Sequence, residues 1–201
     1  RLDPVRFLTN GSTGKMGYAI AQAAVYRGAE VTLVSGPVSL DPPYGAEVVP
    51  VESALDMERE VVSRAKGADV IIKSAAVGDF RPVDVTNQKI KKDAGGTVSL
   101  TRTPDILAEL GGMGLSAVLV GFSMETQDLI QNSAEKLKKK NVDLIVANDL
   151  NTAGAGFGTD TNVASLLKRD GTVLQLPKMS KYSLAHVILD EAVRLYEAKQ
   201  R

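Results

Sequence analysis

Short runs of aliphatic residues alternate with amphipathic segments along most of this 201-residue chain. The aliphatic runs have the length of strands, and most are continuously apolar, as expected of strands covered on both faces. The segments between them repeat apolar residues at helical spacing. The pattern predicts strands over 31–35, 48–51, 70–74, 117–123 and 144–147, and helices over 17–27, 53–65, 104–111 and 128–141.

The last third of the chain follows a different pattern. Two apolar runs, 163–167 and 173–176, flank Asp170-Gly171, a dipeptide that favours a tight hairpin turn. A final amphipathic helix is predicted over 180–199. Because alternating strands and helices are typical of parallel sheets, the chain is expected to form one α/β domain over 1–201. Its fold class is a Rossmann-like, doubly wound, mostly parallel sheet with helices on both faces and a C-terminal hairpin.

A glycine-rich turn precedes the first predicted helix. Gly11, Gly14 and Gly17 allow close backbone approach, and the free N–H groups of a helix N-terminus suit a phosphate, with Ser12 beside them. The spacing matches neither the Walker A motif nor the usual dinucleotide fingerprint. A tight strand-to-helix connection is the plainer interpretation of the same glycines.

Composition and charge narrow the function classes. Lysine plus arginine equals aspartate plus glutamate, 24 each, which argues against general attraction to nucleic acid or to a membrane surface. No apolar run has the length of a membrane span, and no signal peptide is visible, so a cytoplasmic location is expected. With no cysteine and one histidine, His186, a thiolate site, a multi-histidine metal site and a Ser-His-Asp triad are all unlikely.

Two irregular segments and two lysine clusters are candidates for ligand binding. The segments 78–97 and 151–162 lie where parallel sheets place ligands, although the first could carry a dimer arm and the second could be an ordinary surface loop. In a chain of zero net charge, local positive clusters favour a small polyanion such as a triphosphate. The lysines are Lys89, Lys91 and Lys92 in the first segment, and Lys136, Lys138, Lys139 and Lys140 at a helix end, where they could simply complement the helix dipole.

Three predicted strands end in small or polar residues. Asp79 could bind a divalent cation or a ligand hydroxyl, or act as a turn residue. Phe122 could stack on a base or belong to the core. Asn148 and Asp149 follow the next strand along the chain. Polar ends on successive strands predict a ligand site at one edge of the sheet.

Taken together, these motifs resemble the phosphopantothenoylcysteine synthetase family, which in many bacteria forms the C-terminal half of a bifunctional flavoprotein of coenzyme A biosynthesis. The resemblance extends from residue 2 to about 176. The matching stretches are Leu2 to Phe7, Asn10 to Gly17, Val31 to Val38, Ala75-Ala76-Val77 with Asp79-Phe80, Lys89 to Lys92, Thr103 to Ile106, Val120-Gly121-Phe122 with Glu125-Thr126, and Asp143 with Asn148-Asp149.

The resemblance implies a two-step ligation. The carboxylate of 4′-phosphopantothenate attacks the α-phosphate of CTP, which gives an acyl-cytidylate and pyrophosphate. The amino group of L-cysteine then attacks this mixed anhydride and releases CMP. Such a reaction needs Mg²⁺ or Mn²⁺ with the nucleotide and no protein nucleophile, and no flavin is expected in this domain.

Residue roles follow from the same resemblance. Asn10 and Lys89 are the expected catalytic residues, with Lys89 needed to form the acyl-nucleotide and Asn10 needed for its conversion with cysteine. Asp79 is the expected metal ligand. Arg6, Asn10, Ala75 and Ala76 are expected to bind the phosphopantothenate. The expected nucleotide-binding residues are Ser12, Gly14, Ser74, Ala75, Asp79, Phe80, Lys89, Pro104, Asp105, Ile106, Leu107, Phe122, Lys136, Lys140 and Asn148.

The family also implies partners. Arg6 is expected to reach a substrate phosphate across a homodimer interface, so that two subunits share each active site. Fusion to, or assembly with, a flavin-dependent decarboxylase is also expected. Family members usually carry a leading strand before the stretch that matches Leu2-Asp3-Pro4, so the sheet is expected to lack its first strand here. Gly11 and Gly78 stand where other residues are common in the family.

Two other functions fit parts of the pattern. An NAD(P)-dependent oxidoreductase would explain the alternating strands and the glycine turn. However, the 31–35 strand ends in Ser35-Gly36, where a ribose-binding acid is expected. A nucleotide-binding module without catalysis would explain the same residues, and turnover is the observation that separates it from the ligase.

Overall fold

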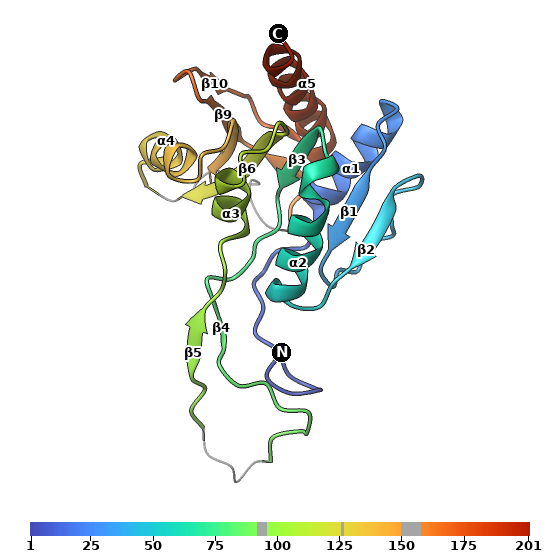
Figure 1. The fold of residues 1–201 in the computed structure, drawn as a ribbon, viewed down its shortest axis with the longest axis vertical. Coiled ribbons are helices and arrows are strands. Elements are labelled where there is room, and N and C mark those ends of the chain that lie inside the picture. The colour runs from blue at the N-terminus through green and yellow to red at the C-terminus, as the bar shows by residue number, and fades with distance from the viewer. Residues whose placement is uncertain (92–95, 126, 150–157) are drawn as a thin grey trace.

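The structure, a computed structural model, describes residues 1–91, 96–125, 127–149 and 158–201 (Figure 1). Five strands form the main sheet in the order β10-β9-β7-β6-β3. β3, β6 and β7 run parallel, and β9 and β10 add antiparallel at one edge. The bounds are β3 Val70–Lys73, β6 Val118–Glu125, β7 Leu144–Asp149, β9 Ala164–Lys168 and β10 Val173–Gln175. The predicted parallel arrangement and C-terminal hairpin are confirmed.

Two further strands stand apart from this sheet. β1 (Thr32–Ser35) and β2 (Glu47–Pro50) pair in parallel with each other. In the described part of the chain they form no ladder with β3, so the predicted sheet is divided into two parts. Helix α2 (Ala54–Arg64), with a short 3₁₀ turn at Ala65–Gly67, packs against β1 and against α3, which links the strand pair to the domain.

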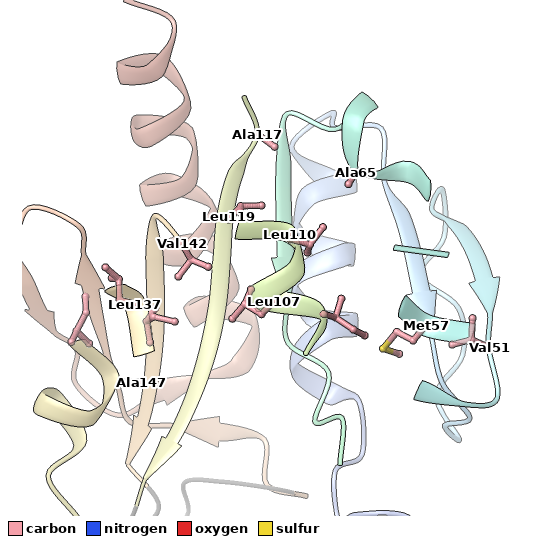
Figure 2. Close-up of a cluster of buried hydrophobic side chains, with 13 residues drawn as sticks. Val51, Met57, Ala65, Leu107, Leu110, Ala117, Leu119, Leu137, Val142 and Ala147 are labelled. Atoms are coloured by element: carbon pink, nitrogen blue, oxygen red, sulfur yellow. The ribbon is translucent and has the colours of Figure 1, made fainter. Parts of the chain in front are cut away.

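Helices cover both faces of the main sheet, as the sequence predicts. α1 (Lys15–Tyr26) and α5 (Lys181–Lys199) lie on one face, and α3 (Ile106–Gly112) and α4 (Leu129–Lys139) lie on the other. Side chains along a strand alternate between the faces. Val118 and Val120 therefore pack with α1 and α5, whereas Leu119 packs with α3 (Figure 2).

Strands β6 and β7 are longer than their apolar runs indicate. β6 continues to Glu125 and β7 to Asp149, because the ladder between them extends through the pairs Met124–Asn148 and Glu125–Asp149. The polar residues that were predicted to follow these strands are therefore the last residues of the strands themselves. Their side-chain directions are fixed by the sheet rather than by a loop.

Two glycines make close packing possible. Gly14 stands before α1 with φ at 78°, and a Cβ there would lie 2.8 Å from Cγ1 of Val38. Gly121 in β6 lies under α3, where a Cβ would lie 2.5 Å from Cδ2 of Leu107. The first allows the tight turn into α1, and the second allows α3 to sit directly on the sheet.

The segment after β3 leaves the domain as a long arm (Figure 1). Antiparallel strands β4 (Phe80–Pro82) and β5 (Leu100–Arg102) form its base. The N-terminal residues run beside it, and the amide of Thr86 donates to the carbonyl of Leu2 at 3.1 Å. An arm was one of two interpretations of 78–97. Lys92 lies outside the described residues, as do Thr126 and most of the second irregular segment.

The remaining strands form a small pair near α5. β8 (Thr161–Asn162) and β11 (Met179–Ser180) are antiparallel, and Ser180 then caps α5 through its side chain. Among the residues described, no helix combines the length and apolar content required to cross a membrane.

Candidate active site

Asn10 connects the glycine-rich turn to the segment after β3. Its side-chain Oδ1 accepts a hydrogen bond from the Ser12 amide at 2.8 Å, and its Nδ2 donates to the carbonyl of Ala76. The two expected substrate-binding segments, which are 66 residues apart in sequence, are therefore in contact. The amide side chain is held from both ends, which fixes its orientation at this edge of the sheet.

Ser74 lies under the start of α1. A Cβ at Gly17 would lie 2.8 Å from Oγ of Ser74, so only glycine lets the helix approach the end of β3 this closely. Ser12, Gly14 and Ser74, three of the predicted nucleotide contacts, thus belong to one region. The open N–H groups at the start of α1 are directed to the same region.

A buried carboxylate organises the N-terminal segment. Asp3 is 1% exposed, and its Oδ1 accepts from the amides of Val5 at 2.8 Å and Arg6 at 2.7 Å. Its Oδ2 accepts from Nε and Nη2 of Arg6 and, at 3.1 Å, from the amide of Ile90. Burial alone would raise the pKa of the Asp3 carboxyl, but these donors outweigh it and hold that pKa well below its usual range.

Asp3 accepts hydrogen bonds from the N-terminal segment and from the segment that contains Lys89. Arg6 and Lys89 therefore line the same cavity. Nη2 of Arg6 also donates to the Ile90 carbonyl at 2.7 Å. The cavity has a volume of about 480 Å³ and is lined by Val5, Arg6, Lys89, Ile90 and Lys91. Three of its five lining residues are basic, so it suits an anionic group such as a phosphate or a carboxylate.

The base of the arm brings Asp79 beside the start of α3. The carbonyl of Asp79 accepts from the amide of Thr103 at 2.9 Å, immediately before the predicted nucleotide segment 104–107. Asp105 caps α3 by accepting from the amide of Ala108 at 3.0 Å. Ile106 and Leu107 are 1% and 4% exposed and belong to the core, so only their backbone groups are free to face a ligand.

A cluster of lysines lies on the α3–α4 face at the end of β3. Lys140, just after α4, pairs with Asp105 of α3. Lys136 lies one helical turn earlier on the same face. Lys73, the last residue of β3, is close enough to both lysines for their charges to act on it. Burial, with the charges of Lys136 and Lys140, lowers the pKa of Lys73 to about 8, against the opposing effect of Asp79.

Phe122 and Asn148 belong to the other face. Phe122 packs with the α1–α5 cluster, which places it among partly buried core residues. Asn148 is 6% exposed, and its Oδ1 accepts from Nδ2 of Asn162 at 3.0 Å. Nζ of Lys181 donates in turn to Oδ1 of Asn162 at 2.7 Å. Asn148 is thus held by a buried polar chain that starts at α5.

The predicted residues therefore meet at one edge of the sheet but divide between its faces. Asn10, Ser12, Gly14, Ser74, Phe122 and Asn148 belong to the α1 side, whereas Asp105, Lys136 and Lys140 belong to the α3–α4 side. Arg6 and Lys89 lie farther out, where the arm meets the N-terminal segment. A ligand that contacts all three groups has to extend across the carboxyl ends of β3 and β6.

Asp79 is an exposed carboxylate at this edge. Among the described residues its side chain forms no hydrogen bond or ion pair, and no group of three or more histidine or acidic side chains could hold a metal ion unaided. Mg²⁺ commonly takes one or two carboxylates and completes its shell with phosphate oxygens and water. A single free carboxylate beside a polyphosphate fits that mode of binding.

Sequence reasoning missed two residues of this region. Asp3 was noted only as part of a matching stretch, although its side chain ties Arg6 to Ile90. Lys73 was assigned to a strand, and its signal was the one charged residue in an otherwise apolar run. At the end of β1, Ser35 bonds with the hydroxyl of Tyr18 at 3.0 Å, and no acid stands in the position that NAD binding favours.

Comparisons with known proteins give the family and the fold of this chain. Residues 1–196 match the family model described as DNA/pantothenate metabolism flavoprotein C-terminal domain. The chain is 54% identical over 196 residues to the coenzyme A biosynthesis bifunctional protein CoaBC of Bacillus subtilis, covering 96% of this chain and 48% of that protein. The CoaBC protein of Escherichia coli strain K12 is 42% identical over 205 residues, covering 100% of this chain and 50% of that protein.

A solved structure shows the same fold. The crystal structure of the C-terminal domain of CoaBC superposes with a TM-score of 0.83 at 42% identity, covering 98% of this chain and 90% of that one. This chain spans about half the length of the curated relatives it matches.

Proposed function

Since the chain belongs to the DNA/pantothenate metabolism flavoprotein C-terminal domain family, we propose that it is a phosphopantothenate–cysteine ligase of coenzyme A biosynthesis. CTP is the proposed co-substrate. The carboxylate of 4′-phosphopantothenate displaces pyrophosphate from the α-phosphate, and the amine of L-cysteine then displaces CMP from the acyl-cytidylate. The reaction needs substrates held in line and charge stabilised, and it needs no protein nucleophile.

The observation that carries this proposal is the double anchoring of Asn10. Its amide is fixed between the Ser12 amide and the Ala76 carbonyl, at the junction of the glycine-rich turn and the end of β3. An amide held in this way is a preorganised polar group next to helix N–H donors, and such groups stabilise an oxyanion without reorganising. Asn10 is accordingly proposed to contact the acyl-cytidylate while cysteine attacks it.

Lys89 and Arg6 supply positive charge in the cavity between the arm and the N-terminal segment. Both line the cavity under the arm, and Arg6 is oriented by Asp3. Lys89 is proposed to stabilise negative charge on the α-phosphate during formation of the acyl-cytidylate, and Arg6 to bind the phosphate of 4′-phosphopantothenate. A mobile ammonium suits a charge that develops during reaction, whereas a fixed guanidinium suits a permanent phosphate.

The nucleotide is proposed to bind across the sheet edge. Ser12, Gly14, Ser74 and Ala75 would contact it from the α1 side, with Phe80, Phe122 and Asn148 nearby. The backbone of 104–107 and the side chains of Lys136 and Lys140 would contact it from the α3–α4 side. Asp79 would hold Mg²⁺ or Mn²⁺ together with the phosphate oxygens, and the metal would supply charge neutralisation there.

A homodimer is proposed as the working unit. The arm and the N-terminal segment expose a set of large apolar side chains, which is unusual for a surface that stays in water. They are Val5, Phe7, Leu8, Phe80, Val83, Val85, Val98 and Leu100. Pairing of two arms would cover these residues and bring Arg6 close to the second subunit's site. Fusion to, or assembly with, a flavin-dependent decarboxylase is also proposed, since the relatives are bifunctional proteins.

Two variants separate the half-reactions. Lys89→Gln is expected to block acyl-cytidylate formation, because the charge on the α-phosphate loses its cation. Asn10→Asp is expected to form the intermediate and to capture it slowly with cysteine. Quenched single-turnover mixtures of the full-length protein, followed by mass spectrometry, measure both steps.

Lys66→Gln is the matched control, since Lys66 is an exposed lysine far from the site and should behave as wild type. Equal loss of both steps in both variants would show that the assigned roles are wrong. Absence of any acyl-cytidylate in the wild-type protein, with 4′-phosphopantothenate, CTP and Mg²⁺ present and cysteine omitted, would overturn the proposed function.

A further inference from the structure

Lys73 holds an unusual place in the fold. It is the last residue of β3, in register with Gly121 of the neighbouring strand. Ile71 packs on the α3–α4 face and Ile72 on the α1–α5 face, so the alternation of the strand turns Lys73 toward α3 and α4. The side chain is half-buried and leaves the sheet at its carboxyl edge, where the candidate site lies.

The charges around Lys73 do not balance. Those that act on it are Lys136 from α4, Lys140 just after α4, and Asp79 from the segment after β3. The start of α3 adds Asp105, which is already paired with Lys140. Within the described residues Lys73 makes no hydrogen bond or ion pair of its own. Three cations therefore meet two carboxylates, one of which is the proposed metal ligand.

Like charges placed close together at a half-buried position raise the free energy of the folded protein. An ammonium group that loses water and gains cationic neighbours is destabilised in its charged form. The lowered pKa of Lys73, about 8, reports that cost. An anion placed between the three amines would reverse both effects, because it supplies the missing counter-charge and the missing hydrogen-bond acceptors.

We propose that Lys73 is a phosphate-binding residue that joins Lys136 and Lys140 in holding the phosphate groups of a nucleotide. The identity of the nucleotide as CTP rests on the proposed function, whereas the capacity of the three lysines to bind phosphate does not. Lys73 thus extends the nucleotide site from the helix residues onto the sheet. It also gives nucleotide binding a dependence on pH.

The sign of that dependence follows from the charges. In the free protein the pKa of Lys73 is about 8, and a bound polyanion raises it. The complex therefore carries more protons than the free protein between pH 8 and the higher pKa of the bound state. Binding near pH 8 should therefore be accompanied by proton uptake, and affinity should fall as the pH rises above 8.

Isothermal titration calorimetry of the full-length protein tests this directly. CTP with Mg²⁺, and separately inorganic pyrophosphate, are titrated at pH 8 in two buffers that differ in ionisation enthalpy, which yields the protons taken up. Lys73→Met is expected to bind CTP about tenfold more weakly. Lys73→Arg is expected to retain binding and to lose the proton uptake, because a guanidinium remains charged throughout this range.

Lys66→Met is the control, because it removes one exposed lysine outside both lysine clusters and should change neither quantity. Wild-type affinity in Lys73→Met would overturn the inference, as would unchanged proton uptake in Lys73→Arg or failure of the wild-type protein to bind either ligand. Proton-linked CTP binding without ligase turnover would overturn the proposed function and leave this inference standing. Normal ligase turnover together with wild-type CTP affinity in Lys73→Met would overturn this inference and leave the proposed function standing.

Discussion

Two positively charged regions border the candidate site, and they are built in different ways. Under the arm, Arg6 and the backbone of Ile90 are fixed by Asp3, a buried carboxylate that accepts five hydrogen bonds. On the α3–α4 face, Lys73, Lys136 and Lys140 have one paired carboxylate among them, Asp105. In the first region hydrogen bonds fix the orientation of the charged group, and in the second the positive charges outnumber their paired carboxylates.

This difference assigns the two regions different tasks. Groups that are already oriented cost little to use, so the region at Asp3 suits the positioning of one phosphate and one reacting carboxylate. A cluster of amines with too few counter-charges selects a ligand by its negative charge more than by its shape, and a polyanion stabilises it most. We therefore expect substitutions in the first region to affect alignment and those in the second to affect nucleotide affinity.

The largest effect should come from removing the charge of Asp3. Asp3→Asn keeps the size of the side chain but leaves Arg6 and the Ile90 amide with a weaker acceptor. The KM for 4′-phosphopantothenate should rise, and acyl-cytidylate formation should slow, each by about tenfold or more. Steady-state and single-turnover kinetics of the full-length protein measure these changes, with the CTP affinity unchanged.

Asp41→Asn is the control for that substitution, since Asp41 is an exposed carboxylate elsewhere on the chain. A thermal melt of each variant separates misfolding from misalignment. If Asp3→Asn weakened CTP binding as much as phosphopantothenate binding, the division between the two regions would be wrong.

A backbone clash offers a way to disturb the lysine region without changing its charge. A Cβ at Gly111 in α3 would lie 1.8 Å from the backbone carbonyl oxygen of Lys140. Gly111→Ala should therefore push α3 from the end of α4, separate Asp105 from Lys140, and destabilise the fold by about 3 kcal/mol. The melting temperature should fall by roughly 6 to 12 °C, and CTP affinity should fall with it.

Gly112→Ala is the matched control, because no atom lies within 4 Å of a Cβ at that helix position. It should leave the melting temperature unchanged or raise it slightly. Similar melting temperatures for the two variants would mean that the contact between Gly111 and Lys140 does not hold the lysine region together.

The smallest effect concerns an acidic pair between α2 and α3. Burial raises the pKa of Glu58 in α2, and neighbouring Glu109 in α3 raises it further, with Arg81 opposing. A raised folded pKa means that this contribution to stability is fully present below the unfolded value, 4.5, and is lost as the pH rises through the folded value.

Glu58→Gln should therefore be slightly more stable than wild type at pH 7 and should lose that advantage in acid. Chemical denaturation at pH 4 and pH 7 measures the difference in the free energy of unfolding, and Glu52→Gln, at an exposed glutamate, is the control. A variant less stable than wild type at pH 7 would contradict the like-charge interpretation.

Much of the fold could be predicted because its strands are continuous apolar runs and its helices have clear boundaries. The extension of β6 to Glu125 could not, since it depends on pairing with β7 and not on local hydrophobicity. The position of Asp79 and Asn148 just after or at the end of strands predicted that both lie at one edge of the sheet, where the structure has them. The face of the sheet on which each side chain lies could be known only from the strand register. Phe122 and Lys140 lie on opposite faces.

The roles of Asp3 and Lys73 depend on contacts between distant segments. Asp3 meets Ile90 across 87 positions, and no periodicity in the sequence reports that distance. Lys73 is a single charged residue in an apolar strand, and only the approach of α4 gives it cationic neighbours. The polar chain from Asn148 through Asn162 to Lys181 is likewise formed by the pairing of β8 with the start of α5.

The most direct test of the proposed ligase function is the complete reaction of the full-length protein with 4′-phosphopantothenate, L-cysteine and CTP in the presence of Mg²⁺. Mass spectrometry follows phosphopantothenoylcysteine, and a coupled assay follows pyrophosphate. Both products should form in equal amounts, and omitting cysteine should leave acyl-cytidylate bound to the enzyme. Pyrophosphate release that does not require 4′-phosphopantothenate, or no product with any nucleoside triphosphate, would contradict the ligase function.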